Sequence, residues 1–463
     1  MITRIEIDGF KTFRQFKLDL APLQVIVGLN GVGKSNLFDA LRLLSLLADN
    51  DLRQAFQALR GEAGELFTAL PNGQHLDTIR LAVDMLVERS VQDSWGARAD
   101  LKYTRLRYEL HILRRADEQG LERLYVIRES LASIRRSEDD WIKAQGLSVK
   151  DWLPRVTGGR APFISTLQET GLPTIYLHQD GRSGRKASVA EKIERTVLSS
   201  VINTEFPHAF AARQEMRRWR FLHLDPEALR EPSSMLAEPY VTAEGRNLPG
   251  ALARLQSEDS TLLNDISRDL ANLVPGILEV TVEKDQPRNR YILWARIEDQ
   301  RAFSSRVLSD GTLRLLALVT FKNDPQHNGV LCFEEPENGV HPFRLKNMAR
   351  LLRALATDFN DLEQVDEPLR QLLVNTHSPI LVSQPAIRSS LLFADLVTRV
   401  DRALGETPLR VTQIHPVAPA QYQMKLLAQT VSPEQVYTLD QVIQYLNSAD
   451  LGEALAEFGA ALS

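Results

Sequence analysis

Eight residues, GLNGVGKS at Gly28–Ser35, have the types and the spacing of a loop that binds phosphate. They fit the pattern G-x-x-x-x-G-K-[ST], after an apolar segment and before a helix-prone one. Gly31 and Gly33 let backbone N–H groups turn towards a phosphate without obstruction by a Cβ atom. Lys34 places a positive charge on the β- and γ-phosphates, and Ser35 offers a hydroxyl to Mg²⁺. A helix that starts here points the positive end of its dipole at the anion.

A second acidic motif, LCFEEPENGVHP at 331–342, ends an apolar run with two adjacent glutamates. Removing such a pair from water is costly unless a cation compensates it. A magnesium-bound phosphate nearby would be that cation. Glu334 would then orient Mg²⁺ directly or through water, and Glu335 would accept a proton from the water that attacks the γ-phosphate. Aspartate is usual at the first position, so the longer Glu334 predicts water-mediated contact or slow hydrolysis.

Two further motifs complete the set. VLSDGTLRLLAL, at 307–318, places Ser309, Asp310 and Gly311 directly before an apolar helix, which makes a second anion site. This motif cannot reach the phosphates of its own chain if the two sites lie at opposite ends of one domain. LLVNTHSP, at 372–379, reads as an apolar strand with His377 at its tip, placed to hydrogen-bond a γ-phosphate.

In this order, the motifs GLNGVGKSN, LSDGTLR, CFEEPENGVHP and VNTHSP resemble those of ABC-type ATPase heads of the SMC/Rad50/RecF/OLD class (predicted AAA-family ATPases, AAA_21/AAA_15-like). The opening IEIDGFKTFRQFKLDL also looks like the first strands of that class. The resemblance covers residues 1–130 and 215–400. It implies that the motif at Ser309 caps a γ-phosphate held by a second subunit. The implied nucleotide-binding residues are Asn30, Gly31, Gly33, Lys34, Ser35, Asn36, Ser309, Asp310 and Gly311, with Ser35 and Glu334 on the metal and Glu335 and His377 as the catalytic pair.

The expected fold is α/β: an ABC-type P-loop head with an antiparallel N-terminal β subdomain and a mainly parallel sheet flanked by helices, plus a helical insertion. Short apolar bursts over 3–28 and a hairpin at 104–113 and 122–131 predict the first part. Alternating helices and strands after 310 predict the parallel layer. The expected division is 1–130, the P-loop half of the head; 131–215, the helical insertion; 216–400, the half with the other motifs; and 401–463, a small C-terminal tail subdomain.

The insertion is too short for long coiled-coil arms, but it carries GRSGRK at 181–186 and RQEMRRWR at 213–220. One interpretation is contact with nucleic acid or a partner, because arginines bind phosphates and Trp219 can stack on a base. The other is a solvated basic helix face whose charges pair with glutamates. Both stay open at this point. The residues of the nucleic-acid interpretation are Arg182, Arg185, Lys186, Arg217, Arg218 and Arg220.

Composition limits the partners further. The 463 residues carry a net charge of -5, which gives no overall attraction to nucleic acid or to a membrane surface. The single cysteine, Cys332, cannot form an internal disulfide. The N-terminus has no apolar leader-like region, and no apolar stretch has the length of a membrane span. We expect a cytoplasmic protein without membrane contact.

Together these features predict a Mg²⁺-dependent ATPase that converts ATP and water to ADP and phosphate. We expect a homodimer or higher homo-oligomer that closes around two ATP molecules as a switch or clamp acting on DNA or a protein. The resemblance implies an effector such as a nuclease or a toxin, in bacterial anti-phage defence or DNA maintenance. Two alternatives stay open: an OLD-like ATP-dependent nuclease, although no second acidic constellation follows His377, and a regulatory ATP-binding protein with little hydrolysis. An ABC transporter subunit fits the insertion and VNTHSP less well.

Overall fold

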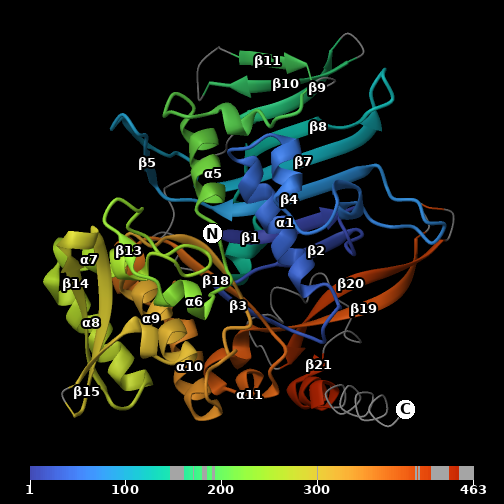
Figure 1. The fold of residues 1–463 in the computed structure, drawn as a ribbon. Coiled ribbons are helices and arrows are strands. Elements are labelled where there is room, and N and C mark those ends of the chain that lie inside the picture. The colour runs from blue at the N-terminus through green and yellow to red at the C-terminus, as the bar shows by residue number, and fades with distance from the viewer. Residues whose placement is uncertain are drawn as a thin grey trace.

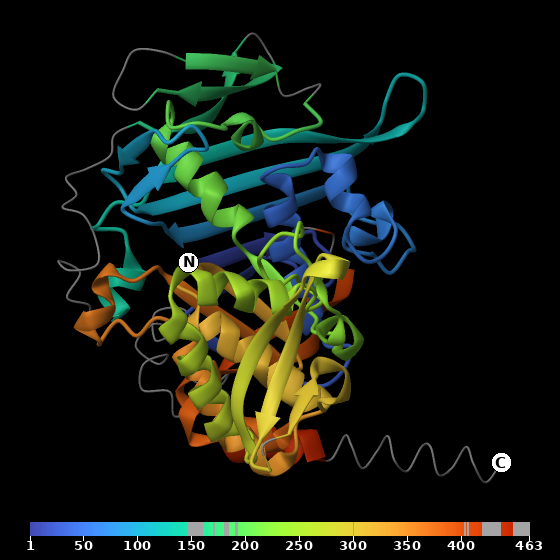
Figure 2. The same ribbon diagram turned by 60° about the vertical axis from the view of Figure 1, so that its left-hand side comes forward.

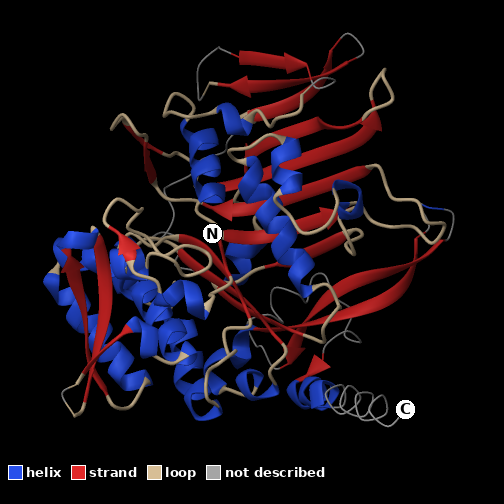
Figure 3. Ribbon diagram, viewed as in Figure 1, coloured by secondary structure: helices blue, strands red, loops and turns tan. Residues whose placement is uncertain are grey.

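The chain folds into an antiparallel sheet above an α/β layer, as Figure 1 shows. The computed structural model describes residues 1–145, 161–169, 172–179, 185–189, 193–299, 301–401, 404, 407–418 and 437–447. Strands dominate the upper layer, and helices crowd the lower one (Figure 3). None of the helices in these ranges has both the length and the apolar character needed to cross a bilayer.

The upper sheet has eight strands among the described residues, and every neighbouring pair is antiparallel. In the strand β1 (Ile2–Asp8), side chains alternate between buried and partly exposed. This period of two is typical of an antiparallel sheet with one covered face. The order is β11 (Arg185–Val189), β10 (Leu172–His178), β9 (Ile164–Glu169), β8 (Glu122–Ser133), β7 (Arg105–Ala116), β4 (Thr78–Leu86), β1 (Ile2–Asp8) and β2 (Phe16–Asp19).

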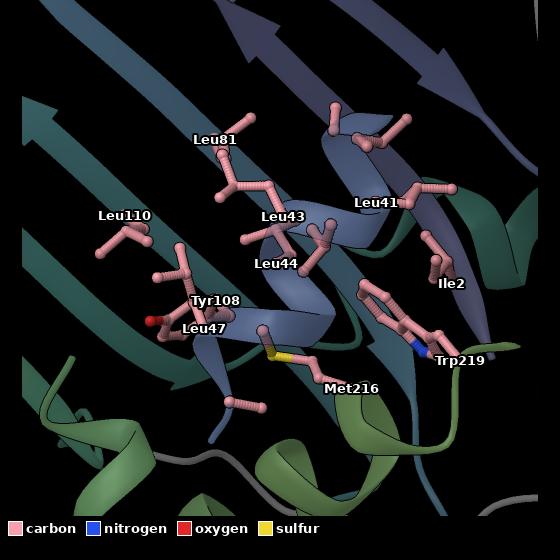
Figure 4. Packing of buried hydrophobic residues seen from close by; sticks show 14 of the residues in the cluster. Ile2, Leu41, Leu43, Leu44, Leu47, Leu81, Tyr108, Leu110, Met216 and Trp219 are labelled. Atoms are coloured by element: carbon pink, nitrogen blue, oxygen red, sulfur yellow. The ribbon is translucent and has the colours of Figure 1, made fainter. Parts of the chain in front are cut away.

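Helices cover one face of this sheet, chiefly α1 (Lys34–Leu47), α2 (Leu52–Gln57) and α5 (Pro207–Arg217). The leucines of α1 recur at helical spacing, which gives the helix one apolar face. Figure 4 shows the resulting core, in which α1 packs between the sheet and the end of α5. Its labelled members are Ile2, Leu41, Leu43, Leu44, Leu47, Leu81, Tyr108, Leu110, Met216 and Trp219.

The lower sheet has seven strands among the described residues and is parallel from its first strand to its fifth. Its order is β12 (Arg220–Leu222), β17 (Gly329–Glu334), β18 (Arg370–Thr376), β3 (Leu23–Val27), β19 (Leu391–Asp401), β20 (Thr407–Ala418) and β21 (Tyr437–Thr438). All five residues of β3 are buried, as expected for a strand covered on both faces. The prediction of an antiparallel N-terminal sheet and a mainly parallel second sheet is confirmed.

The other elements surround this lower sheet. A small sheet stands beside the helices (yellow in Figure 2) and consists of β13 (Ser233–Ser234), β15 (Arg290–Ile297), β14 (Ile277–Asp285) and β16 (Ala302–Ser304). The longer helices of this layer are α7 (Leu248–Glu258), α8 (Ser260–Leu273), α9 (Asp310–Asn323) and α10 (Leu345–Ala354). Shorter elements are α3 (Asp140–Gln145), α6 (Pro226–Arg230), α11 (Pro379–Val382), and the pair β5 (Ser90–Gln92) and β6 (Arg98–Asp100). Residues 439–447 are helical.

The predicted helical character of residues 131–215 does not hold for the part of that range that the structure describes. The described part of that range contains β9, β10 and β11, which extend the upper sheet, and only two α-helices, α3 and α5. The segments ISTLQE and LPTIYLH carry the β-branched and aromatic residues that favour strands. β9 pairs with the outer edge of β8 at Leu131 and Ile164, and β10 in turn pairs with β9.

The basic segment at 213–220 does not present Trp219 for stacking on a base. Trp219 is only 3% exposed, and its indole Nε1 donates to Glu215 Oε1 at 3.1 Å, so it cannot stack on a base. Arg217 pairs with Asp49 at 2.7 Å, and the Arg220 guanidinium lies 6.0 Å from the ring centre of Tyr240. Arg218 donates to Gln214 Oε1. Of the other predicted contacts, Arg182 lies outside the described residues, and Arg185 and Lys186 belong to β11, whose side chains are not described.

Replacement of Trp219 by alanine should lower the free energy of unfolding by about 3–5 kcal/mol, because it removes a large buried side chain. Arg217→Ala, two residues from Trp219, removes an exposed ion pair. It should change the free energy of unfolding by less than about 1 kcal/mol. Urea denaturation followed by far-UV circular dichroism measures both. Equal stability of Trp219→Ala and the wild type would contradict the buried position of this residue.

Candidate nucleotide site

Three parallel strands bring three of the four predicted motifs to one edge of the lower sheet. In their register, Glu334 of β17 lies opposite Asn375 of β18, and Asn375 lies opposite Ile26 of β3. The loop with the glycines follows β3, and the glutamate pair ends β17. Carboxyl ends of parallel strands meet at the same edge, which is where α/β sheets bind ligands.

A cavity of about 170 Å³ lies at this edge. Eight predicted residues line it together with Asn375: Asn30, Gly31, Gly33, Lys34, Ser35, Asn36, Glu334 and Glu335. Pockets that enclose a whole drug-sized ligand measure roughly 300–1,000 Å³. The cavity therefore has room for phosphate groups and leaves the rest of a nucleotide uncovered.

The loop owes its shape to its glycines. Gly31 has φ +80° and Gly33 has φ +97°, a region that residues with a Cβ rarely adopt. α1 begins immediately after Gly33, so its free N–H groups face the cavity. Lys34 is buried, and its Nζ donates to the carbonyl oxygens of Gly28 and Leu29 at 2.6 Å each. Burial lowers the pKa of the Lys34 ammonium to about 8, while the neighbouring glutamates oppose the shift. A phosphate would give this ammonium a charged acceptor in place of two neutral carbonyls.

Arg60 contacts Glu334 at the edge of the cavity. Its Nη2 lies 3.3 Å from Glu334 Oε1, and its Nε lies 3.9 Å from Asp39 Oδ1. Asp39 also pairs with Lys11 at 2.6 Å. Arg60 is 64% exposed, so this contact can open without unpacking the core. Sequence analysis did not find Arg60, because no spacing pattern links an arginine after α2 to a strand end 274 positions later.

Glu335 is held by three groups. It has φ +49°, unusual for a residue other than glycine, and its own N–H donates to the Asn375 carbonyl at 2.8 Å. The Oε1 atom lies 2.9 Å from His377 Nδ1, and Oε2 accepts from Asn338 Nδ2 at 2.7 Å. Such strained positions occur at functional sites, where the surrounding contacts maintain them. The contact with His377 occupies one oxygen of the expected base.

Asn375 is a site residue that sequence analysis missed. It is 3% exposed, its Nδ2 lies 3.4 Å from Ser35 Oγ, and its Oδ1 has no hydrogen-bond partner among the described residues. A buried acceptor without a partner points to an ion or water that completes it. Together with the Glu334 carboxylate and the Ser35 hydroxyl, it forms a set of oxygen ligands suited to hydrated Mg²⁺. The residues therefore fit a magnesium-nucleotide complex.

Glu337 is a third buried carboxyl group next to the site. It is 9% exposed, its Oε1 accepts from the Thr376 hydroxyl, and its Oε2 has no partner among the described residues. Burial raises the pKa of this carboxyl group. The Thr376 contact ties the loop after Glu335 to the strand end that carries His377. The sequence EEPENG did not indicate that Glu337, unlike its neighbouring glutamates, is buried.

The motif at Ser309 lies apart from the cavity, and none of its three predicted residues lines it. Ser309 caps α9, where its Oγ accepts from the Thr312 N–H at 3.3 Å, and Asp310 pairs with Arg230. Both residues are exposed. Gly311 is buried against the loop after Glu335: a Cβ there would lie 2.4 Å from the Gly339 carbonyl oxygen. The structure thus leaves this motif open at the surface of its own chain.

The comparisons agree with this arrangement. Residues 1–93 match a family described as an AAA ATPase domain, and residues 162–383 match one described as an AAA domain, putative AbiEii toxin, Type IV TA system. The chain is 27% identical over 237 residues to the DNA replication and repair protein RecF of Acidothermus cellulolyticus. These matches support an ABC-type ATPase of the SMC/RecF class.

Overlap with individual members of the class is partial. The RecF match covers 48% of this chain, and the chain spans about half, 54%, of that relative's length. The SMC head domain from Thermotoga maritima is 13% identical, with 90% of this chain and 98% of the other covered and a TM-score of 0.37. An Smc head domain bound to the C-terminal domain of ScpA, from Pyrococcus furiosus, is 14% identical, with 92% and 98% covered and a TM-score of 0.43.

Glu335→Gln should reduce ATP hydrolysis about 100-fold or more, because the amide keeps the shape of the side chain but cannot take a proton from water. ATP binding should persist. Phosphate release and equilibrium binding measure the two effects separately. Glu363→Gln, the same change at an exposed glutamate, should hydrolyse ATP like the wild type. Wild-type turnover by Glu335→Gln would remove this residue as the base.

Proposed function

We propose that this chain binds ATP at the carboxyl edge of the lower sheet and hydrolyses it to ADP and phosphate. Lys34 and the N–H groups at the start of α1 would hold the phosphates, while Ser35, Glu334 and Asn375 would hold hydrated Mg²⁺. When bound, Mg²⁺ would neutralise charge that develops on the β- and γ-phosphate oxygens. Glu335 would accept the proton of the attacking water. His377 would first have to leave Glu335 Oε1, and it could then turn to the γ-phosphate.

We further propose that hydrolysis needs a second copy of the chain. The observation that carries this proposal is that Ser309 and Asp310 are exposed and lie outside a cavity lined by the P-loop and the glutamate pair. In a two-fold dimer, each copy would present this motif to the nucleotide of the other. The small cavity volume supports the same arrangement, because a partner surface would cover what one chain leaves open.

Closure of such a dimer would make the protein a nucleotide-driven switch or clamp. We propose that the switch controls an effector, either DNA or a protein such as a nuclease or a toxin, in anti-phage defence or DNA maintenance. The family description that mentions a putative AbiEii toxin supports a link to such systems, and the named role of RecF in DNA replication and repair supports a link to DNA.

A second candidate function is a regulatory ATP-binding protein with little hydrolysis. The contacts of the two glutamates favour it: Glu334 is longer than the usual aspartate and pairs with Arg60, while Glu335 is held by His377 and Asn338. The rate of phosphate release from the wild type separates the two candidates. Turnover that Glu335→Gln abolishes supports the ATPase, and the absence of turnover with tight ATP binding supports the regulator.

Ser309→Arg should leave ATP binding nearly unchanged and reduce hydrolysis at least tenfold, because a bulky cation would prevent closure over the partner's nucleotide. Mixing Ser309→Arg with Lys34→Ala protein should restore part of the activity. In that heterodimer one composite site carries both changes and the other carries neither.

The matched control is Ser257→Arg, an arginine introduced at another exposed serine, on α7. It should hydrolyse ATP like the wild type. Normal hydrolysis by Ser309→Arg would contradict the composite site. So would a wild type that hydrolyses ATP while sedimentation shows a monomer at every nucleotide condition.

A further inference from the structure

A chain of side-chain hydrogen bonds connects the P-loop to the C-terminal strand β20. The Asn36 amide Nδ2 lies 2.9 Å from Thr12 Oγ1, which lies 2.6 Å from Thr412 Oγ1, which lies 2.8 Å from the Val32 carbonyl oxygen. These residues come from the β1–β2 loop, the P-loop, the first turn of α1, and β20. These hydrogen bonds join segments up to 400 positions apart in the sequence.

The direction of each bond in this chain follows from the available protons. Only the Thr412 hydroxyl can donate to the Val32 carbonyl, so Thr412 Oγ1 must accept from the Thr12 hydroxyl. Thr12 Oγ1 then accepts from the Asn36 amide. No hydroxyl proton is left over, and the Val32 carbonyl is satisfied. The N–H of Thr412 also donates to the carbonyl oxygen of Thr12 at 3.0 Å, which fixes the two segments together through their backbones.

The same hydroxyls lie against the glycine turn of the P-loop. A Cβ at Gly33 would lie 2.1 Å from Thr412 Oγ1 and 2.8 Å from Thr12 Oγ1. Thr412 is 2% exposed, so its hydroxyl cannot move aside into solvent. Gly33 is therefore glycine for two reasons, its φ of +97° and this close approach.

We propose that Thr12 and Thr412 are positioning residues that keep the P-loop in its phosphate-binding shape before nucleotide arrives. A glycine-rich loop is costly to order, and a loop ordered beforehand avoids that cost on binding. Without these hydrogen bonds, only a fraction of the protein molecules would have the P-loop in the conformation that binds phosphate. The apparent dissociation constant for ATP would then rise by the inverse of that fraction. The inference rests on the proposed function, since it assumes that this loop binds ATP.

The proposal also gives new roles to two predicted parts of the chain. Asn36, predicted to contact nucleotide, lines the cavity, and its amide nitrogen is bound to Thr12. Residues 401–463 were predicted to form a small C-terminal tail subdomain, and β20 from that range contacts the P-loop directly. Any displacement of β20 would therefore reach the nucleotide site through Thr412.

Titration calorimetry with ATP and Mg²⁺ tests the proposal on three variants. Thr412→Val, which keeps the shape and removes the hydroxyl, should weaken ATP binding about tenfold, equal to about 1.4 kcal/mol. Thr412→Ser, which keeps the hydroxyl, should bind ATP within about twofold of the wild type, well inside the tenfold that 1.4 kcal/mol represents. Thr398→Val makes the matched change at an exposed threonine on the neighbouring strand β19 and should have no effect. A merely structural role would lower the melting temperatures of free and ATP-bound protein equally and leave the affinity unchanged.

A folded Thr412→Val protein that binds ATP as tightly as the wild type would overturn the positioning role of Thr12 and Thr412. It would leave the proposed function intact. A wild type that binds no ATP would overturn the proposed function itself. If Thr412→Val does not fold, Thr12→Val removes the other hydroxyl of the same hydrogen-bond series. It should show the same tenfold loss of ATP affinity.

Discussion

The parallel register of β3, β18 and β17 is the constraint on which the site depends. Because Glu334, Asn375 and Ile26 lie in line across three strands, the P-loop, the amide and the glutamate pair reach the same edge. A shift of one strand by a single residue would turn its side chains to the opposite face and bury the carboxylates in the core. Apolar strands fully buried on both faces make such a shift costly.

The charged groups at this edge satisfy one another in the free protein. Lys34 donates to carbonyls of its own loop, Arg60 pairs with Glu334, and His377 contacts Glu335. A buried charge without partners is strongly unfavourable, so the carbonyl contacts of Lys34 stabilise the site in the absence of ligand. The contacts of Arg60 and His377 are partly exposed to solvent and contribute less. Bound nucleotide would have to replace them with phosphate and metal contacts. Under the proposed function, these contacts would have to rearrange before hydrolysis.

The sequence predicted the parts of the site that have local patterns. The glycine spacing, the strand before it, the paired glutamates and the strand tip with His377 are each readable within a dozen residues, and the structure places them as expected. Asn375, Arg60 and Thr412 could not be found in this way, because each acts through a partner hundreds of positions away. Their residue types are ordinary, and only the fold makes them part of the site.

In the fold, too, the elements with a local sequence pattern were predicted and those that depend on distant partners were not. The alternation in β7 and β8 predicted a hairpin, and the regular succession of helices and strands after residue 310 predicted the parallel layer. The strands of residues 131–215 were missed because they are short and lie between charged and glycine-containing segments, and only their pairing with the edge of β8 and with one another places them in the sheet. Trp219 looked like a surface aromatic because four arginines surround it in sequence, yet those side chains turn outward or pair internally while the indole packs into the core.

The central claim is that this edge binds the phosphates of ATP, and equilibrium titration of Mg²⁺-ATP into Lys34→Ala tests it most directly. Lys34 supplies the only buried ammonium among the described residues that line the cavity. The wild type and Lys346→Ala, a matched change at an exposed lysine, should each bind one ATP per chain, while Lys34→Ala should bind at least a hundredfold more weakly. Equal affinity of Lys34→Ala and the wild type would contradict the account.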